Sequence, residues 1–366
     1  MDNRVRYFDE INILRAFATL AVISIHVSGD FSKISTINFL MTTYMAVKSF
    51  SSFAVPLFIC ISGFVLYNKY SGKISLKNFY EKRLMSILPP YIIFSTFYLG
   101  IPYLVSIVLS TPVNFDIPHI VYQYVTGGSS YHLWFFVLII QFYLLYPAIV
   151  WMYRYCDSRD RSLELLFAAF LVGFFYNVYP IPGELRVALM FLGYLFYFIL
   201  GMIVRSRYDE LLLKPLSKTS LYCMSVPLLC GTIFGTFNFA QQFYNFDRTQ
   251  IQPVVGQYWG WLTAMITPLF FVVMFAFCLS ISLHIVSRKR AGFRLLEKIG
   301  HYSFGIYLVH AFVLYVIVLA FSRFGFDWNN WLFYPLAFCL TLILSILSVE
   351  IIQQLPYSKY IIGSTR

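Results

Sequence analysis

The sequence predicts an all-α polytopic membrane protein with about ten transmembrane helices and both termini in the cytoplasm. Hydrophobic residues make up 59% of its 366 residues and charged residues only 12%, whereas soluble chains carry about a quarter charged residues. The mean hydropathy is +0.71, and apolar windows of about twenty residues, the length that crosses a bilayer, recur along the chain. These observations exclude a soluble globular protein.

Ten apolar stretches are expected to cross the membrane, and the basic residues between them predict its orientation. The expected spans are residues 11–31, 50–67, 84–109, 132–153, 163–179, 187–204, 219–237, 258–286, 301–321 and 331–353. Alternate gaps hold 21 of the 27 Lys and Arg residues and the opposite gaps hold five, with Arg15 left inside a span. Because basic loops stay in the cytoplasm, both termini are expected there, and the net charge of +11 reflects orientation rather than nucleic-acid binding.

No soluble domain, internal repeat or low-complexity tail interrupts these spans, so one membrane-embedded domain is expected over residues 1–366. The gap 110–131 has two prolines and a Gly-Gly pair, which predict a loop or a re-entrant segment, and the gap 238–257 is similar. The six cysteines are scattered without metal-ligand spacing, so neither a disulfide nor a metal site is expected. The first stretch lacks a small-residue cleavage site and is expected to be a retained span.

The first span, residues 11–31, carries Arg15 and His26 inside its apolar run. Eleven steps of ~100° make three turns plus ~20°, so the two side chains lie on one helical stripe, ~16 Å apart along the axis. A cation in hydrocarbon costs at least ~2.5–3.5 kcal/mol, so such residues normally face a bundle interior or a wet cavity. The stripe favours a polar passage in which chemistry takes place. The alternative is that Arg15 snorkels to the interface and His26 is a packing residue.

Asp30 follows His26 by four residues and is therefore expected on the same helix face. A carboxylate in that position can orient an imidazole ring and raise its basicity, which suits general-base catalysis. Solvation of an ordinary helix end explains Asp30 equally well. The catalytic candidates of this span are His26, Arg15 and Asp30.

The second and third spans add a kink and a basic entrance. Pro56 and Gly63 predict a kink in the second span, which either lines a cavity or serves packing. Lys82 and Arg83 stand at the cytoplasmic entrance of the third span. Membrane orientation accounts for basic residues there, but they are also suited to hold the phosphates of a cytoplasmic ligand.

Three further residues are candidates for substrate binding. His132 and Trp134 open the fourth span at the outer interface, where aromatic residues usually form the interfacial belt and less often stack on a sugar ring. His310 lies near mid-membrane in the ninth span, where lining a cavity and packing are about equally expected.

Taken together, six stretches resemble the membrane-bound acyltransferase 3 family, whose members O-acylate bacterial glycans. They are the first-span pair of Arg15 and His26, VPLFICISGF (Val55 to Phe64), the basic-then-proline run from Lys82 to Pro89, HLWF (His132 to Phe135), YSFGIYLVH (Tyr302 to His310) and the terminal LPYSKYIIG (Leu355 to Gly363). Without an added extracytoplasmic domain, the chain is similar to the single-domain branch, which includes the O-acyltransferases of intercellular polysaccharide adhesin and enterobacterial common antigen.

The resemblance implies transfer of an acyl group, most often acetyl, from cytoplasmic acyl-CoA to a hydroxyl of an extracytoplasmic or lipid-linked glycan, in the bacterial cytoplasmic membrane. It implies that His26 is catalytic and that Arg15 and Arg83 bind the acyl-CoA donor, with Lys82 beside them. Many members have a further arginine three positions after the residue that matches Arg83, and this chain has Ser86 there. No metal is implied.

The residues are compatible with this chemistry, in which neutral His26 accepts the proton of the attacking hydroxyl; an acyl-histidine intermediate is the mechanistic alternative. Two other functions would use the same topology. A transporter or flippase for a lipid-linked glycan or small solute also needs intramembrane Arg and His, but the paired repeats typical of transporters are not found. A non-catalytic partner of an exopolysaccharide synthase leaves the shared stripe of Arg15 and His26 unexplained.

Overall fold

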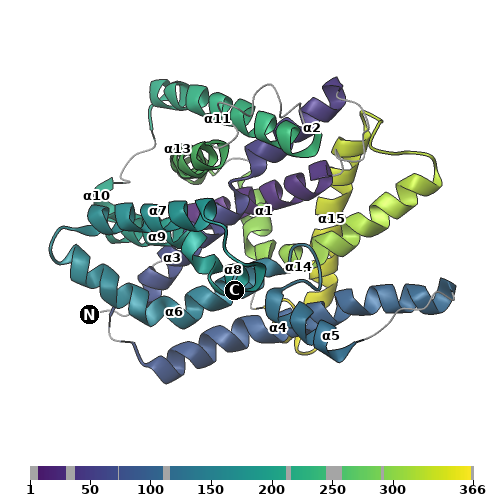
Figure 1. The fold of residues 1–366 in the computed structure, drawn as a ribbon, viewed down its shortest axis with the longest axis horizontal. Coiled ribbons are helices and arrows are strands. Elements are labelled where there is room, and N and C mark those ends of the chain that lie inside the picture. The colour runs from purple at the N-terminus through teal and green to yellow at the C-terminus, as the bar shows by residue number, and fades with distance from the viewer. Residues whose placement is uncertain are drawn as a thin grey trace. The chain divides into compact units, whose positions relative to one another are not determined.

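The computed structural model describes residues 7–29, 38–72, 74–109, 116–211, 216–244, 258–289 and 292–363. These residues form helices and, in the ranges just given, no β-strand. The helices are α1 (Asp9–Ser28), α2 (Phe39–Ser51), α3 (Ala54–Tyr70), α4 (Leu76–Leu109), α5 (Ile117–Thr126), α6 (Trp134–Asp157), α7 (Ser162–Val178), α8 (Gly183–Ala188), α9 (Met190–Ser206), α10 (Tyr208–Leu211), α11 (Lys218–Tyr244), α13 (Trp259–Arg288), α14 (Phe293–Arg323), α15 (Phe333–Gln353) and α16 (Ser358–Ile361) (Figure 1).

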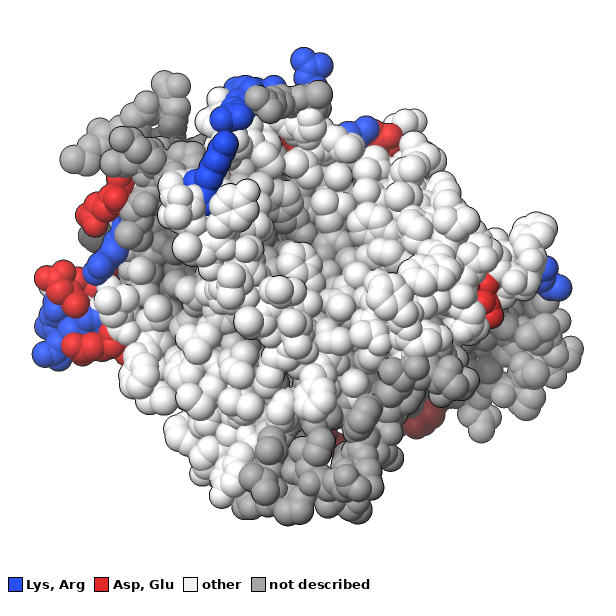
Figure 2. All heavy atoms as spheres, turned by 90° about the horizontal axis from the view of Figure 1, so that it is seen from above, with Lys and Arg blue, Asp and Glu red and all other residues white. Residues whose placement is uncertain are grey.

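Nine helical segments within the described residues are long and apolar enough to cross a bilayer, and α7 is apolar but shorter. Each of the ten expected spans overlaps one of these ten segments, so the prediction of an all-α polytopic membrane protein is confirmed. Large apolar side chains are exposed on them, for example Leu104 (63%), Leu229 (62%) and Ile351 (63%). Figure 2 shows one face whose middle is uncharged and whose Lys, Arg, Asp and Glu side chains gather towards the edges. Apolar surface of this kind is what lipid covers.

The internal contacts divide the chain into two compact units, and we describe each by itself. The first unit comprises Met1–Lys69, Leu166–Pro180 and Leu192–Ser348, and the second comprises Tyr70–Leu165, Ile181–Phe191 and Val349–Arg366. The expectation of one domain over the whole chain stays a prediction.

In the first unit, α1 is the helix on which the others pack. It lies against α14, α2 and α13, and α11 lies beside α2 and α13 (Figure 1). Ile13, Leu14, Ala16 and Ala18 of α1 are fully buried at 0% exposure. A helix that is apolar on nearly every side belongs in the interior of a bundle, and the first span therefore holds this unit together.

The second span begins earlier than the sequence analysis expected. The side chain of Asn38 accepts a hydrogen bond from the backbone N–H of Met41 and so caps α2, which starts at Phe39 rather than near residue 50. Lys48, in the gap between the first two expected spans, therefore belongs to α2 within the apolar segment Phe39–Tyr70.

The interruption of this segment lies between α2 and α3, at Ser52 and Phe53, one turn before Pro56, whose ring prevents a helical hydrogen bond to the carbonyl of Ser52. Pro56 is in the first turn of α3, where its missing N–H costs no hydrogen bond. A Cβ on Gly63 would lie 2.1 Å from the carbonyl oxygen of Phe198, and one on Gly201 would lie 1.9 Å from that of Cys60. Gly63 therefore serves close packing of α3 on α9, in the manner of small residues between membrane helices.

In the second unit, α4 packs on α6 and α16, and α5 packs on α6. The partly buried amide of Gln141 is satisfied, because it donates to the carbonyl of Val187 (2.8 Å) and accepts from the N–H of Phe191 (3.0 Å). The gap 110–131, predicted as a loop or a re-entrant segment, contains the short helix α5, which ends at Gly127 in the left-handed region (φ 75°). Of the similar gap 238–257, residues 245–257 lie outside the described residues.

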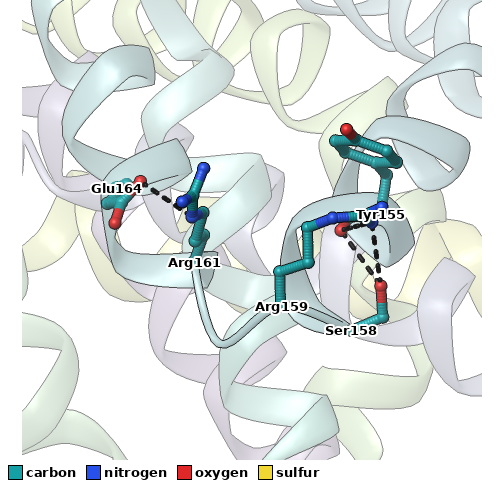
Figure 3. Close-up of polar contacts among 5 residues, drawn as sticks. All are labelled: Tyr155, Ser158, Arg159, Arg161 and Glu164. Atoms are coloured by element: carbon teal, nitrogen blue, oxygen red, sulfur yellow. Dashed lines mark hydrogen bonds and ion pairs between the residues drawn. The ribbon is translucent and has the colours of Figure 1, made fainter.

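The connection from α6 to α7 is a tight basic turn (Figure 3). The guanidinium of Arg159 lies 3.8 Å from the centre of the Tyr155 ring and donates to the Tyr155 carbonyl at 3.1 Å. Arg161 and Glu164 form an exposed ion pair at 3.8 Å, which contributes about 0–1 kcal/mol. The cytoplasmic side expected for this loop from its basic residues stays a prediction.

Candidate active site

The interface between α1 and α14 carries the candidate catalytic residues of the first unit. The two helices run parallel, because the side chain of Asn12 donates to the carbonyl of Glu297 while the ring of His26 lies beside that of His310. They approach closely, since a Cβ on Gly300 would lie 2.1 Å from the carbonyl oxygen of Asn12. Parallel packing of the first and ninth expected spans is what the predicted topology requires.

His26 and His310 form a pair of imidazole rings inside this interface. Their centroids are 5.2 Å apart and their planes are inclined by 32°. His310 is fully buried at 0% exposure, whereas His26 is partly exposed. His26 thus contacts a fully buried His310 while part of its own surface stays exposed.

Lys48 of α2 belongs to the surroundings of His26. It lies on the same face of α2 as Met41, Tyr44 and Met45, which are buried at 3% exposure or less. Its ammonium lies 5.2 Å from the centre of the Phe239 ring and acts electrostatically on His26. Lys48 is therefore a cation of α2 whose charge reaches the candidate catalytic histidine.

Arg15 lies at the other level of the same interface. It is partly exposed and its charge acts on Tyr7, whose hydroxyl lies 3.4 Å from Nε2 of His301 and whose ring stacks on that of His301. Partial burial raises the pKa of Tyr7; the charge of Arg15 opposes this shift, and the carboxylates of Asp9 and Glu297 add to it. Arg15 thus sits among polar groups and not in a purely apolar environment.

A large cavity lies along the opposite stripe of α1. It has a volume of about 1130 Å³ and its α1 lining consists of Phe17, Leu20, Ala21 and Ser24. At ~100° per residue these positions centre roughly 180° away from Arg15 and His26. The hydroxyl of Ser24 is hydrogen-bonded to that of Tyr334 at 2.6 Å. This apolar cavity is therefore separate from the face of α1 that carries the candidate catalytic residues.

The other two basic candidates, Lys82 and Arg83, lie in the second unit. Their surroundings differ, because Arg83 contacts other side chains whereas Lys82 is exposed. Arg83 donates to the hydroxyl of Tyr70 at 3.1 Å, and its guanidinium lies 5.0 Å from the centre of the Tyr70 ring and 6.0 Å from that of Tyr143. Arg154 donates to the carbonyls of Tyr70 and Gly72. Lys82 is exposed. Tyr70 thus accepts a hydrogen bond from Arg83 at its hydroxyl and one from Arg154 of α6 at its backbone carbonyl.

The remaining candidates, His132, Trp134 and Asp30, also differ in their surroundings. His132 is buried at 1% exposure, with Nδ1 3.1 Å from the hydroxyl of Ser130 and its ring edge-on to Tyr98 at 5.1 Å. A sugar cannot reach that ring in this conformation, whereas Trp134 keeps part of its indole exposed. Asp30 lies outside the described residues, so its catalytic role stays a prediction.

A family model described as an acyltransferase domain matches residues 8–350, which include every helix from α1 to α14 and most of α15. The chain belongs to the acyltransferase 3 family. It is therefore an enzyme that transfers an acyl group from a donor to an acceptor. Comparison with curated proteins and with solved structures gives no match.

Family membership says which chemical groups a candidate site of this acyltransferase must supply. Acyl transfer to a hydroxyl needs a base that accepts the hydroxyl proton and a group that stabilises negative charge on the acyl oxygen. On α1, His26 is a candidate for the base, whereas Arg15, ~16 Å away along the helix, is a candidate for binding an anionic group. Within the described residues, no group of three His, Cys, Asp or Glu side chains could hold a metal ion.

Two basic residues that lie near candidate groups, one in each unit, were missed by sequence reasoning. Lys48 was assigned to a loop because the apolar window was begun too late, and Asn38 followed by an apolar run was the available signal. Arg154 was counted only as an orientation charge, and nothing in the sequence links it to Tyr70, 84 residues away.

Proposed function

We propose that this acyltransferase moves an acetyl group from cytoplasmic acetyl-CoA to a hydroxyl of an extracytoplasmic or lipid-linked glycan in the bacterial cytoplasmic membrane, with His26 as general base. The observation that carries the proposal is the placement of His26: partly exposed, next to His310, and on the same stripe of α1 as Arg15. Polar groups so arranged inside a membrane helix serve a reaction or a passage, and family membership favours the reaction.

In the proposed step the acceptor oxygen bonds to the acyl carbon and the carbon–sulfur bond of the thioester breaks. The proton of the hydroxyl passes to His26 and from there to the leaving thiolate of CoA, so that His26 is neutral again at the end. A general base in this role contributes a factor of ~10²–10⁴. Arg15 lies ~16 Å from His26 along α1, so its permanent positive charge is suited to the anionic part of the donor and not to the reacting carbonyl.

On the donor side, Arg83 is the candidate for the phosphates of CoA. Arginine suits phosphate because its planar guanidinium donates two parallel hydrogen bonds. The contact with Tyr70 fixes the orientation of this guanidinium, and Arg154 adds a second positive charge at the same tyrosine. We propose that Arg154 contributes the charge that Ser86 does not.

The test uses the full-length protein in proteoliposomes, with radiolabelled acetyl-CoA and glycan from cells that lack the protein. His26→Ala should abolish label transfer to the glycan while the amount of inserted protein stays the same. His284→Ala is the matched control, because His284 is an exposed histidine of α13, and it should transfer label as the wild type does. Transfer at the wild-type rate by His26→Ala would refute the assignment of the general base.

A further inference from the structure

We propose that His310 is a positioning residue for the proposed reaction: its Nε2 accepts a hydrogen bond from one ring nitrogen of His26, so that the other nitrogen of His26 faces the acceptor hydroxyl. This inference rests on the proposed function. It assigns to His310 a different role from the substrate contact that the sequence analysis expected.

The first step of the argument is the tautomer of His310. Its Nδ1 lies 3.1 Å from the carbonyl oxygen of Ile306 and 2.8 Å from that of Tyr307. Carbonyl oxygens only accept hydrogen bonds, so Nδ1 must carry the hydrogen. A second proton on Nε2 would create a buried cation, because His310 is 0% exposed. Nε2 of the neutral ring is therefore a hydrogen-bond acceptor held in place by the backbone of α14.

The second step is the distance to His26. A ring nitrogen lies roughly 1.2 Å from the centre of an imidazole, so the centroid separation of 5.2 Å leaves roughly 2.9 Å between two nitrogens that point at each other, an ordinary hydrogen-bond length. Catalytic hydrogen bonds often align fully only when the substrate is bound. The two nitrogens are not aligned for this bond in the structure, so the bond requires a rotation of the His26 ring.

The third step is what the bond does. A neutral His26 that donates one N–H to His310 has its lone pair on the opposite nitrogen, which is the form that accepts a proton from a hydroxyl. In Ser-His-Asp enzymes a carboxylate selects the tautomer in this way. Here a neutral acceptor takes that place, and it avoids the cost of an isolated carboxylate in a membrane interior. The ring of Tyr307, 5.7 Å from that of His310, helps to confine the imidazole.

The test compares three substitutions of His310 in the full-length protein in proteoliposomes, with acetyl-CoA and cell-derived glycan. Gln can place its amide oxygen near the position of Nε2, whereas Asn is too short to do so and Phe has no acceptor. We expect His310→Gln to keep at least about a tenth of kcat, and His310→Asn and His310→Phe to lose roughly 10²-fold, the cost of a misplaced catalytic group. The KM for acetyl-CoA should change less than about twofold in all three, since binding is not altered.

The outcomes separate this inference from the proposed function. Equal losses in His310→Gln and His310→Asn, or wild-type kcat in His310→Phe, would overturn the positioning role. A raised KM for the glycan at unchanged kcat would also overturn it and return His310 to substrate binding. Should His26→Ala be inactive while every His310 variant is fully active, only the inference about His310 fails. Full activity of His26→Ala removes the proposed function, and this inference fails with it.

Discussion

Replacing Gly300 by alanine should force α1 and α14 apart and slow acyl transfer. The new Cβ would lie 2.1 Å from the carbonyl oxygen of Asn12 and 2.8 Å from its side-chain oxygen, while ordinary contact begins at 3.4 Å, so the backbones must separate by about 1.3 Å. Overpacking of this kind costs ~1–3 kcal/mol, offset by up to ~1 kcal/mol of helix propensity. We expect a net loss of roughly 1–2 kcal/mol. Because a misplacement of about 1 Å can cost ~10² in rate, kcat should fall by roughly that factor.

The assay is thermal unfolding in detergent at one fixed scan rate, together with acetyl transfer in proteoliposomes. Gly300→Ala should lower the melting temperature by roughly 2–8 °C. Gly260→Ala in α13 is the matched control, since nothing lies within 4 Å of its Cβ, and its melting temperature should stay the same or rise slightly. If Gly300→Ala melts and reacts like the wild type, α1 and α14 do not approach each other at this glycine and the geometry argued for His26 and His310 is wrong.

Two further predictions follow from side chains that the structure distinguishes. Arg83→Ala should raise the KM for acetyl-CoA roughly tenfold or more, since a hydrogen bond to a charged group contributes ~1.5–3 kcal/mol. Lys82→Ala, at an exposed position, should change this KM less than about threefold. Equal effects of the two substitutions in steady-state kinetics would contradict a specific role for Arg83. Ser24→Ala and Tyr334→Phe each remove one hydroxyl of a 2.6 Å bond, so each should cost ~0.6 kcal/mol and the double variant should cost no more than one of them. Additive losses in melting temperature would show that the two hydroxyls do not interact.

The fold could be predicted from the sequence because bilayer thickness leaves few choices for apolar stretches of about twenty residues. The ends of the helices could not, because a hydropathy window stops at the first charges while the helix continues past the membrane surface. α14 begins at Phe293, eight residues before the expected span, and includes Arg294 and Lys298. α2 was missed because the charge of Lys48 ended the apolar window, although the helix that contains Lys48 starts at Phe39.

The candidate site could also be predicted only in part. That Arg15 and His26 share a stripe follows from helical periodicity alone, and their helix spans Asp9–Ser28 as required. Which groups meet that stripe depends on tertiary packing that no short motif encodes: the contact of His26 with His310 joins residues 284 positions apart. Arg154 likewise reaches Tyr70 only because α6 packs on α4 in the second unit.

In the proposed mechanism, the distance between Arg15 and His26 along α1 restricts the kind of donor that both residues can contact. Arg15, with Tyr7 and His301 around it, and His26, with His310 beside it, lie at levels ~16 Å apart along α1. A single donor that contacts both levels must have its charge and its reactive bond separated by a long thin arm, as an acyl-CoA has. A compact donor such as acetyl phosphate can occupy only one level at a time. We therefore expect acetyl phosphate to give no label transfer to the glycan at concentrations at which acetyl-CoA saturates the enzyme, and efficient transfer from it would show that Arg15 and His26 do not act on one donor.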